Sequence, residues 1–184
     1  DIRSTETKSY PIVKIGTQYW IGRSLEATRY TDGSSINEIK DYQMNLPGYF
    51  TYNNKYFYTY PAIETGYLST IGWKIPNQKE WDSLKDYLKN RASNLKSGSW
   101  KLIEKGDNYD ALNKSYFNGI PEGYFINYEK TKGYAMKDAG VGYWVSQNKS
   151  DPETKGGVYL LNTNDEIREG TTADRAISVR CIRK

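Results

Sequence analysis

The most informative segment of the sequence is residues 72–81, which read Gly72-Trp73-Lys74-Ile75-Pro76-Asn77-Gln78-Lys79-Glu80-Trp81. Proline biases the residue before it toward extended geometry, so Pro76 favours the end of a strand at Ile75. Asn77 is a preferred helix N-cap residue, and Glu80 stands three positions later, as in a capping box. The segment therefore predicts a strand that ends and a capped helix that begins at once.

A helix over about residues 78–91 follows from the spacing of the apolar side chains. Trp81, Leu84 and Leu88 recur at steps of three and four residues, which places them on one helix face. Nothing in this segment is chemically reactive. We expect it to be scaffold, with the apolar face packed against a core.

The composition of the 184-residue chain narrows the chemistry that it can perform. Histidine is absent, which removes the commonest general base and metal ligand. Cys181 is the single cysteine, so neither an intrachain disulfide nor a cysteine-rich zinc site can form. The length suits one domain, which we expect at residues 10–184, with residues 1–9 as a tail or a junction to another segment.

Charge and hydropathy argue against nucleic-acid and membrane partners. The net charge of +4 is modest, and the lysines and arginines are scattered among acidic residues. A nucleic-acid-binding surface normally shows as a basic face or run, whereas residues 85–91 and 180–184 read as a solvated helix face and a chain end. No apolar run approaches the about 18 residues of a membrane span. We expect no nucleic-acid partner and no membrane insertion by this domain.

The remaining elements are predicted to be short strands and loops. Residues 12–15 and 18–21 flank Gly16-Thr17 as in a hairpin, and aromatic residues alternate with polar ones over residues 49–60. Further strands are expected at residues 123–128, 141–146, 157–162 and 176–183, a turn at 162–165, and a short helical turn within 107–116. One clear helix, small antiparallel sheets and long loops give an α+β domain.

The last predicted strand shows the clearest alternation. Its side chains face two sides in turn: Ile177, Val179 and Cys181 one way, and Ser178, Arg180 and Ile182 the other. The apolar neighbours of Cys181 on its side predict a buried, inert thiol.

Six short motifs stand in a recognisable order over residues 12–183. They are Ile15-Gly16-Thr17-Gln18-Tyr19-Trp20, Tyr52-Asn53-Asn54, Gly72-Trp73-Lys74-Ile75-Pro76 with Glu80-Trp81, Pro121-Glu122-Gly123-Tyr124, Gly142-Tyr143-Trp144-Val145-Ser146 and Ser178-Val179-Arg180-Cys181-Ile182. Together they resemble the Fibrobacter succinogenes major paralogous domain family. We expect the four tryptophans inside these motifs to be core residues: Trp20, Trp73, Trp81 and Trp144.

The resemblance implies a fold and a cellular setting. It implies the C-type lectin-like and formylglycine-generating-enzyme fold, with paired terminal strands, helices beside the sheet and a loop-rich side that faces the ligand. In Bacteroidetes and their relatives, such domains typically belong to secreted or outer-membrane-anchored proteins, including lipoproteins. Some are the adhesive module of a pilus or of a larger surface protein, in which case an upstream domain of the same protein is a further partner.

The chain lacks the catalytic residues of the enzymes that share the implied fold. The formylglycine-generating relatives use a cysteine pair, sometimes with copper, and the sulfoxide-forming relatives hold iron with histidines; this chain has neither set. Catalysis by carboxylates alone stays open, although no acidic pair stands out. We therefore expect that the protein is not an enzyme and that it binds no cofactor. A structural envelope or pilus module without a ligand of its own is the other alternative.

A calcium site is a further possibility that the sequence raises. Asp151-Pro152-Glu153 and residues 162–166 gather oxygen ligands of the kind calcium prefers. The same residue types also form ordinary turns, and we favour that interpretation, so no metal ligand is assigned.

The predicted ligand site is the polar stretch at residues 147–174, ahead of the last strand. Polar loop residues set among aromatics are typical of recognition loops on a rigid scaffold, and lectin-like folds carry their ligand-facing surface here. The candidate ligand-binding residues are Asn148, Asp151, Tyr159, Asn162, Asn164, Asp165 and Arg168. The alternative is a solvated hairpin. The aromatic cluster at residues 49–60 is a second candidate for stacking on sugars.

The function expected from these observations is noncatalytic adhesion at a bacterial cell surface. The partner is a glycan or a protein on a host or neighbouring cell. A sugar ligand would be bound weakly by each domain, with avidity supplied by many copies.

Overall fold

The computed structural model describes residues 1, 3, 7–101, 111–128, 131–146, 156–171 and 174–184. Its strands are β1 (Ile12–Ile15), β2 (Gln18–Ile21), β3 (Asn37–Glu38), β4 (Gly48–Tyr52), β5 (Lys55–Thr59), β6 (Trp73–Lys74), β7 (Tyr124–Tyr128), β8 (Thr131–Ala135), β9 (Gly140–Trp144), β10 (Gly156–Leu161), β11 (Ile167–Thr171), β12 (Arg175–Ile177) and β13 (Ile182–Arg183). The helical elements are α1 (Tyr60–Glu64), α2 (Gln78–Tyr87) and the 3-10 turn η1 (Ala92–Asn94).

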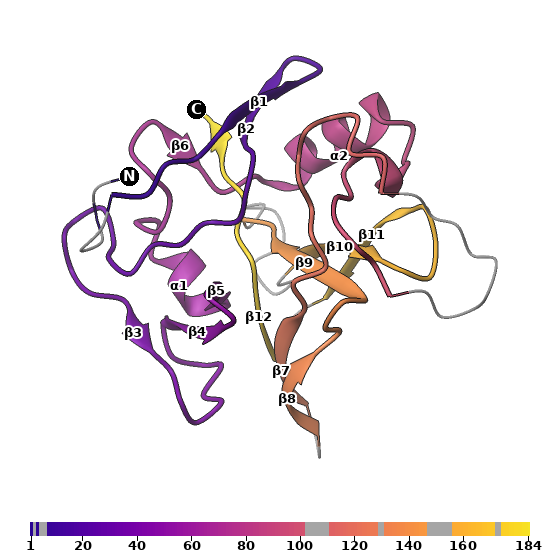
Figure 1. Cartoon of the computed structure of the whole chain (residues 1–184). Coiled ribbons are helices and arrows are strands. Elements are labelled where there is room, and N and C mark those ends of the chain that lie inside the picture. The colour runs from indigo at the N-terminus through magenta and orange to yellow at the C-terminus, as the bar shows by residue number, and fades with distance from the viewer. Residues whose placement is uncertain (2, 4–6, 102–110, 129–130, 147–155, 172–173) are drawn as a thin grey trace.

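The strands form three small sheets (Figure 1). Their orders are β1-β2-β13-β6, β11-β10-β9 and β3-β4-β5-β12-β7-β8. The pairs are antiparallel except β3 with β4. Small sheets with few helices make the fold α+β, as predicted. The N-terminal hairpin pairs with the last strand through Ile182 opposite Trp20, so the predicted pairing of terminal strands is confirmed.

The cap of α2 is the one that the sequence predicts. The Asn77 Oδ1 accepts from the Glu80 backbone N–H at 3.1 Å, and the Asn77 N–H donates to the Glu80 Oε2 at 2.9 Å. The helix ends at Tyr87 rather than at residue 91. The reason is the backbone of Lys89 and Asn90, whose φ angles of 54° and 55° are left-handed and cannot continue a right-handed helix.

Two tight hairpins confirm the predicted strands near the N-terminus and in the aromatic segment. Gly16 turns the chain between β1 and β2 with φ 60°. Asn53 and Asn54 connect β4 to β5 with φ 48° and 59°, the positive values that a type I′ turn requires. Strands β7, β9 and β10 lie where strands were expected, but β8 was not predicted. The helical turn expected within residues 107–116 is absent at 111–116, and residues 107–110 lie outside the described part.

The C-terminal strand runs between two core clusters. The expected continuous strand at 176–183 is divided into β12 and β13, and every residue from 176 to 182 is buried. Ile177, Val179 and Cys181 belong to one cluster and Ile182 to the other, so the predicted alternation is confirmed. Burial raises the pKa of the Cys181 thiol to about 12, as expected of an inert core cysteine.

The four framework tryptophans do not all lie in the core. Trp144 is buried in the first cluster, and Trp20 and Trp81 pack together in the second, with ring centroids 4.8 Å apart. Trp73 is only half-buried at the edge of the first cluster, so its assignment to the core was wrong. It lies on the short strand β6 at the end of its sheet, where one side faces solvent.

Arg180 is the largest buried charged side chain in the described part of the chain, with 0% of its surface exposed. Its Nη1 donates to the Ile21 carbonyl at 3.0 Å and its Nη2 to the Asn118 carbonyl at 2.8 Å. The guanidinium lies 4.4 Å from the Phe117 ring centroid and 5.3 Å from that of Tyr143. One side chain thus joins β2, the loop before residue 119, β9 and the C-terminal strand.

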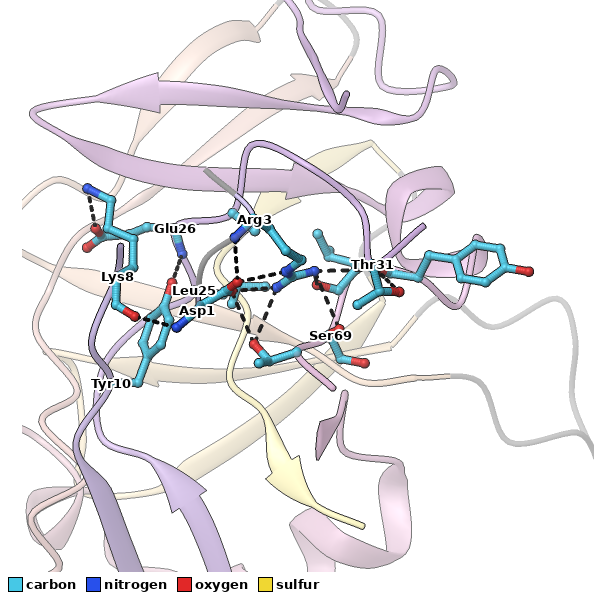
Figure 2. Close-up of polar contacts among 12 residues, drawn as sticks. Asp1, Arg3, Lys8, Tyr10, Leu25, Glu26, Thr31 and Ser69 are labelled. Atoms are coloured by element: carbon cyan, nitrogen blue, oxygen red, sulfur yellow. Dashed lines mark hydrogen bonds and ion pairs between the residues drawn. The ribbon is translucent and has the colours of Figure 1, made fainter. Parts of the chain in front are cut away.

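The first residues of the chain lie against the body (Figure 2). Arg3 forms an ion pair with Asp1 at 2.7 Å and donates to the Leu68 carbonyl at 2.8 Å. The Tyr10 hydroxyl accepts from the Glu26 backbone N–H at 2.9 Å, and burial raises the pKa of Tyr10 to about 12. The boundary between residues 1–9 and 10–184 stays a prediction.

No helix within the described residues is both long enough and apolar enough to cross a membrane.

The replacement Arg180→Lys tests the role of the buried guanidinium. Lysine lacks the guanidinium fork, whose two terminal nitrogens each donate to a different carbonyl here, so we expect the replacement to weaken at least one of the two hydrogen bonds. We expect the free energy of unfolding to fall by about 1–3 kcal/mol, measured by urea denaturation. Arg183→Lys, at an exposed position of β13, is the control and is expected to change little. Equal effects of the two replacements would contradict this role.

Candidate functional site

The structure separates the residues that the sequence proposed as ligand contacts. Asn148 and Asp151 lie outside the described residues. Tyr159 and Asn162 are buried, with 5% and 3% of their surfaces exposed, so the expectation that they are presented to a ligand is wrong. Asn164, Asp165 and Arg168 lie at or near the surface.

Tyr159 is buried because β10 is the middle strand of its sheet, between β9 and β11. Its ring lies over Gly142, where an added Cβ would stand 2.7 Å from the Tyr159 Cε1. The Tyr124 ring packs edge-on at 5.9 Å, and the Arg175 guanidinium lies 5.4 Å from the Tyr159 centroid. The strand that was interpreted as part of a recognition loop is therefore core.

Asp165 and Lys96 attach the turn between β10 and β11 to the segment after α2. The Asp165 carboxylate accepts from the Ser93 backbone N–H at 2.5 Å and pairs with the Arg91 Nε at 3.1 Å. The Lys96 Nζ donates to the Leu161 carbonyl at 2.6 Å and to the Asn164 carbonyl at 2.9 Å. These contacts are structural, and they fix the turn onto the segment after α2.

Lys96 is a buried cation, and its environment disfavours the charge. Burial lowers its pKa from 10.5 to about 8, and the nearby Asp165 offsets only part of this effect. Its ammonium also lies 4.9 Å from the Trp100 ring centroid, which places the half-buried Trp100 beside the same turn. The turn is thus anchored by a group whose charge depends on pH.

Arg168 stands apart from the other predicted residues. It lies on the outer strand β11, exposed, with its Nε 3.8 Å from the Glu166 Oε2. The predicted set therefore does not converge on one surface within the described part of the chain.

A groove with a stacked tyrosine pair is the better candidate for a binding site. This tyrosine groove has a volume of about 250 Å³. Its lining residues come from the β4–β5 hairpin, β8, the turn between β8 and β9, and the loops at residues 98–99 and 120–122. They are Tyr52, Asn53, Lys55, Gly98, Ser99, Ile120, Pro121, Glu122, Tyr134, Lys137 and Asp138.

Tyr52 and Tyr134 form the aromatic wall of the tyrosine groove. Their ring centroids lie 4.0 Å apart with the planes inclined by 24°, and both side chains are half-buried. The Lys137 ammonium lies 5.9 Å from the Tyr52 centroid. An aromatic wall beside cationic and hydroxyl groups suits a ligand with both an apolar face and polar edges.

Gly123 allows Tyr134 to take this position. Its φ is 70°, and an added Cβ would stand 2.8 Å from the Tyr134 hydroxyl oxygen and 2.6 Å from the Ala135 carbonyl oxygen. The Tyr134 hydroxyl donates to the Glu122 carbonyl, and burial raises the pKa of Tyr134. The ring is therefore fixed before any ligand arrives.

The carboxylate of Glu122 is engaged in the interior. Its Oε1 accepts from the Ser178 hydroxyl at 2.7 Å and from the Ser24 hydroxyl. Asp138, the other acidic residue in the lining, is exposed. No group of three or more histidine, cysteine, aspartate or glutamate side chains suited to a metal occurs among the residues that the structure describes. The groups that line the tyrosine groove can stack against a ligand and form hydrogen bonds to it.

The sequence predicted one of the two stacked tyrosines of the tyrosine groove. Tyr52 stands in the aromatic cluster that was proposed to stack on sugars, whereas Tyr134 was missed with β8. The signal that was available is the pair of strand-like runs at 124–128 and 131–135, which are separated by Glu129-Lys130. Gly133 weakens the second run and hides it.

Comparison with known proteins identifies a family. The family model described as the Fibrobacter succinogenes major domain matches residues 13–183. No curated protein and no solved structure matches the chain.

Lys96→Met tests whether Lys96 is a buried cation beneath the turn. The pKa of Lys96 is about 8 in the folded protein and 10.5 when the side chain is free in solution. Between these two pH values the unfolded chain binds more protons than the folded one, so Lys96 makes stability rise with pH. The difference in unfolding free energy, wild type minus variant, should therefore grow by about 1–2 kcal/mol from about pH 7.5 to 9.5.

Urea denaturation at each pH measures this difference. The exposed Lys132→Met is the matched control and should give a difference that does not change with pH. A flat difference for Lys96→Met as well would show that the buried ammonium is not desolvated.

Proposed function

The chain belongs to the Fibrobacter succinogenes major domain family, and we propose that it is a noncatalytic recognition domain of a bacterial cell-surface protein. Its partner is a glycan or a protein on a host or neighbouring cell. The cellular setting is extracytoplasmic, on an outer-membrane-anchored lipoprotein or a pilus. The proposal includes no nucleic-acid partner, no cofactor and no insertion of this domain into a membrane.

The fold proposed for this domain is C-type lectin-like. Two features support it. The N-terminal hairpin pairs with the C-terminal strand β13, and the strands of the three small sheets are connected mostly by loops rather than by regular helices. Both chain ends contact the same segment, since Arg3 donates to the Leu68 carbonyl and the Lys184 N–H donates to the Gly72 carbonyl.

The observation that carries the proposal is the Tyr52–Tyr134 stack in the tyrosine groove. Sugar rings present C–H faces to aromatic side chains and hydroxyls to the polar groups around them. Here the aromatic wall is flanked by Asn53, Ser99 and Lys137, which offer donors and acceptors at its edge. A small number of polar groups around an apolar surface is the usual arrangement of a small-molecule site.

The size of the tyrosine groove favours the end of a glycan chain. Its volume of about 250 Å³ is below the range of about 300–1,000 Å³ that is typical of sites for drug-sized ligands. Such a groove holds little of a ligand by itself, so each domain binds weakly. Many copies on one cell surface would supply avidity.

The proposal predicts that the isolated domain binds glycans on an array and that Tyr52→Thr weakens this binding. Threonine retains strand propensity at the end of β4 but removes the aromatic wall. We expect at least a tenfold loss of affinity, about 1.4 kcal/mol or more. Lys137→Gln should weaken binding less, since it removes only a cation at the edge.

Tyr128→Thr is the matched control for Tyr52→Thr. Tyr128 also ends a strand, β7, and is 61% exposed, but it does not line the tyrosine groove. Its variant should bind glycans like the wild type, and thermal unfolding should show that all variants are folded. Absence of binding to any glycan or cell surface would favour the alternative of a structural envelope or pilus module.

A further inference from the structure

A second groove, on the side of α2, is lined by cations. This basic groove has a volume of about 540 Å³, within the range of about 300–1,000 Å³ that small-molecule sites occupy. It lies between the β1–β2 hairpin, the end of α2 and the loop at residues 113–118. Its lining residues are Lys14, Ile15, Tyr87, Leu88, Lys89, Arg91, Asn94, Lys114, Ser115 and Tyr116.

Most cations of the basic groove are not neutralised within the described part of the chain, although the Lys14 ammonium lies 5.6 Å from the Tyr19 ring centroid. Lys14, Lys89 and Lys114 are exposed, and none of the three forms an ion pair with a described residue. Arg91 pairs with Asp165, which lies outside the lining. No acidic residue occurs among the described residues that line the groove, so Lys14, Lys89 and Lys114 give it an excess of positive charge. Like charges brought together repel one another and favour an anion between them.

Two tyrosines stand at the basic groove with most of their surface in solvent. Tyr87 is 63% exposed and Tyr116 is 70% exposed. The Tyr87 ring lies against the hairpin turn at Gly16, where an added Cβ would stand 3.1 Å from the Tyr87 Cδ2. Exposed aromatic rings beside cations give a ligand both a stacking surface and a charge partner.

The loop that carries Tyr116 is held in an unusual conformation. Asn113, Tyr116 and Asn118 have φ angles of 45°, 57° and 56°, values that non-glycine residues rarely adopt. The Asn113 Nδ2 donates to the Asn118 Oδ1 at 2.7 Å, and the Asn118 N–H donates to the Asn113 Oδ1 at 2.9 Å. The buried Arg180 donates to the Asn118 carbonyl at 2.8 Å.

The wall of the basic groove at the end of α2 also contains residues with a left-handed backbone. Lys89 and Asn90 follow α2 with φ angles of 54° and 55°. The Asn90 N–H donates to the Lys85 carbonyl at 2.8 Å, which closes the end of the helix. Local strain of this kind persists where surrounding contacts enforce it, and it clusters at binding sites. Both walls of the groove therefore present their cations and rings from a rigid backbone.

We propose that the basic groove binds an anionic saccharide, a sugar whose ring carries a carboxylate or a sulfate group. Lys14, Lys89 and Lys114 pair with the anionic group, and Tyr116 and Tyr87 contact the sugar rings. This site is separate from the tyrosine groove and does not depend on the function proposed for it.

A saccharide fits these observations better than a nucleic acid does. A nucleic-acid chain needs a basic track that follows its phosphates over several nucleotides. Here the cations gather in one groove of limited volume, and the charge of the whole chain is only +4. Such a groove matches one or two charged sugar rings.

The test is calorimetric titration of the full chain with digalacturonate, with its dimethyl ester and with a sulfated chondroitin disaccharide. Digalacturonate or the sulfated sugar should bind, and the comparison of the two shows which anionic group is preferred. The neutral ester should bind at least tenfold more weakly. Raising the salt from about 50 to 500 mM should weaken the binding of the anionic sugar, because the lysines are exposed.

Variants locate the binding. Lys114→Gln should weaken it about threefold, as expected of a single exposed charge pair, and the triple replacement of Lys14, Lys89 and Lys114 by Gln at least tenfold. Tyr116→Asn removes the ring but keeps a residue that tolerates a left-handed backbone, and it should also weaken binding. Lys132→Gln and Tyr128→Thr, at exposed positions away from the groove, are the matched controls and should bind normally.

Three results with the saccharides would overturn the proposal. They are equal binding of the ester and the acid, anionic binding that the triple variant retains, and no binding of either anionic sugar. A thymidine oligonucleotide that binds more tightly than either sugar would also overturn it, in favour of a nucleic-acid site. The tyrosine-groove variant Tyr52→Thr should leave this binding unchanged, which keeps the outcome for the two grooves distinct.

Discussion

The buried guanidinium of Arg180 is the contact on which the arrangement of this protein depends. A charge without exposure to water is costly unless it is hydrogen-bonded inside, and Arg180 makes two such bonds, to carbonyls of Ile21 and Asn118, which lie far apart in the sequence. The rings of Phe117 and Tyr143 lie against its planar face, as arginine favours. Because these partners come from β2, β9 and the loop before residue 119, the C-terminal strand can take its place only when all three are assembled.

Both grooves are built outward from this arrangement. Asn118, which accepts from Arg180, also closes the loop that presents Tyr116 in the basic groove. Ser178, two residues before Arg180, donates to Glu122, whose backbone carbonyl in turn fixes the hydroxyl of Tyr134 in the tyrosine groove. The C-terminal strand therefore links two surfaces that share no lining residue. Recognition by rigid surfaces of this kind loses little conformational entropy on binding.

The sequence predicted what is local and missed what is set by distant contacts. The cap at Asn77 and Glu80 and the hairpin turn at Gly16-Thr17 depend on a few neighbouring residues, and both were expected. The polar composition of residues 147–174 suggested exposed loops, but the Tyr159 strand is buried because β9 and β11 pair with it on both sides. Likewise, the stack of Tyr52 on Tyr134 joins residues of two separate hairpins, which no periodicity along the chain reveals. The family resemblance was visible in the order of motifs, and the family match confirms it.

The most direct test of this account is the crystal structure of the domain with the neutral glycan that it binds most tightly on an array, after prolonged incubation of the two. The account predicts an intact glycan whose terminal ring lies on the Tyr52–Tyr134 pair, with its hydroxyls bonded to the polar rim of the tyrosine groove. A glycan seated on the turn between β10 and β11, or a cleaved product, would contradict it.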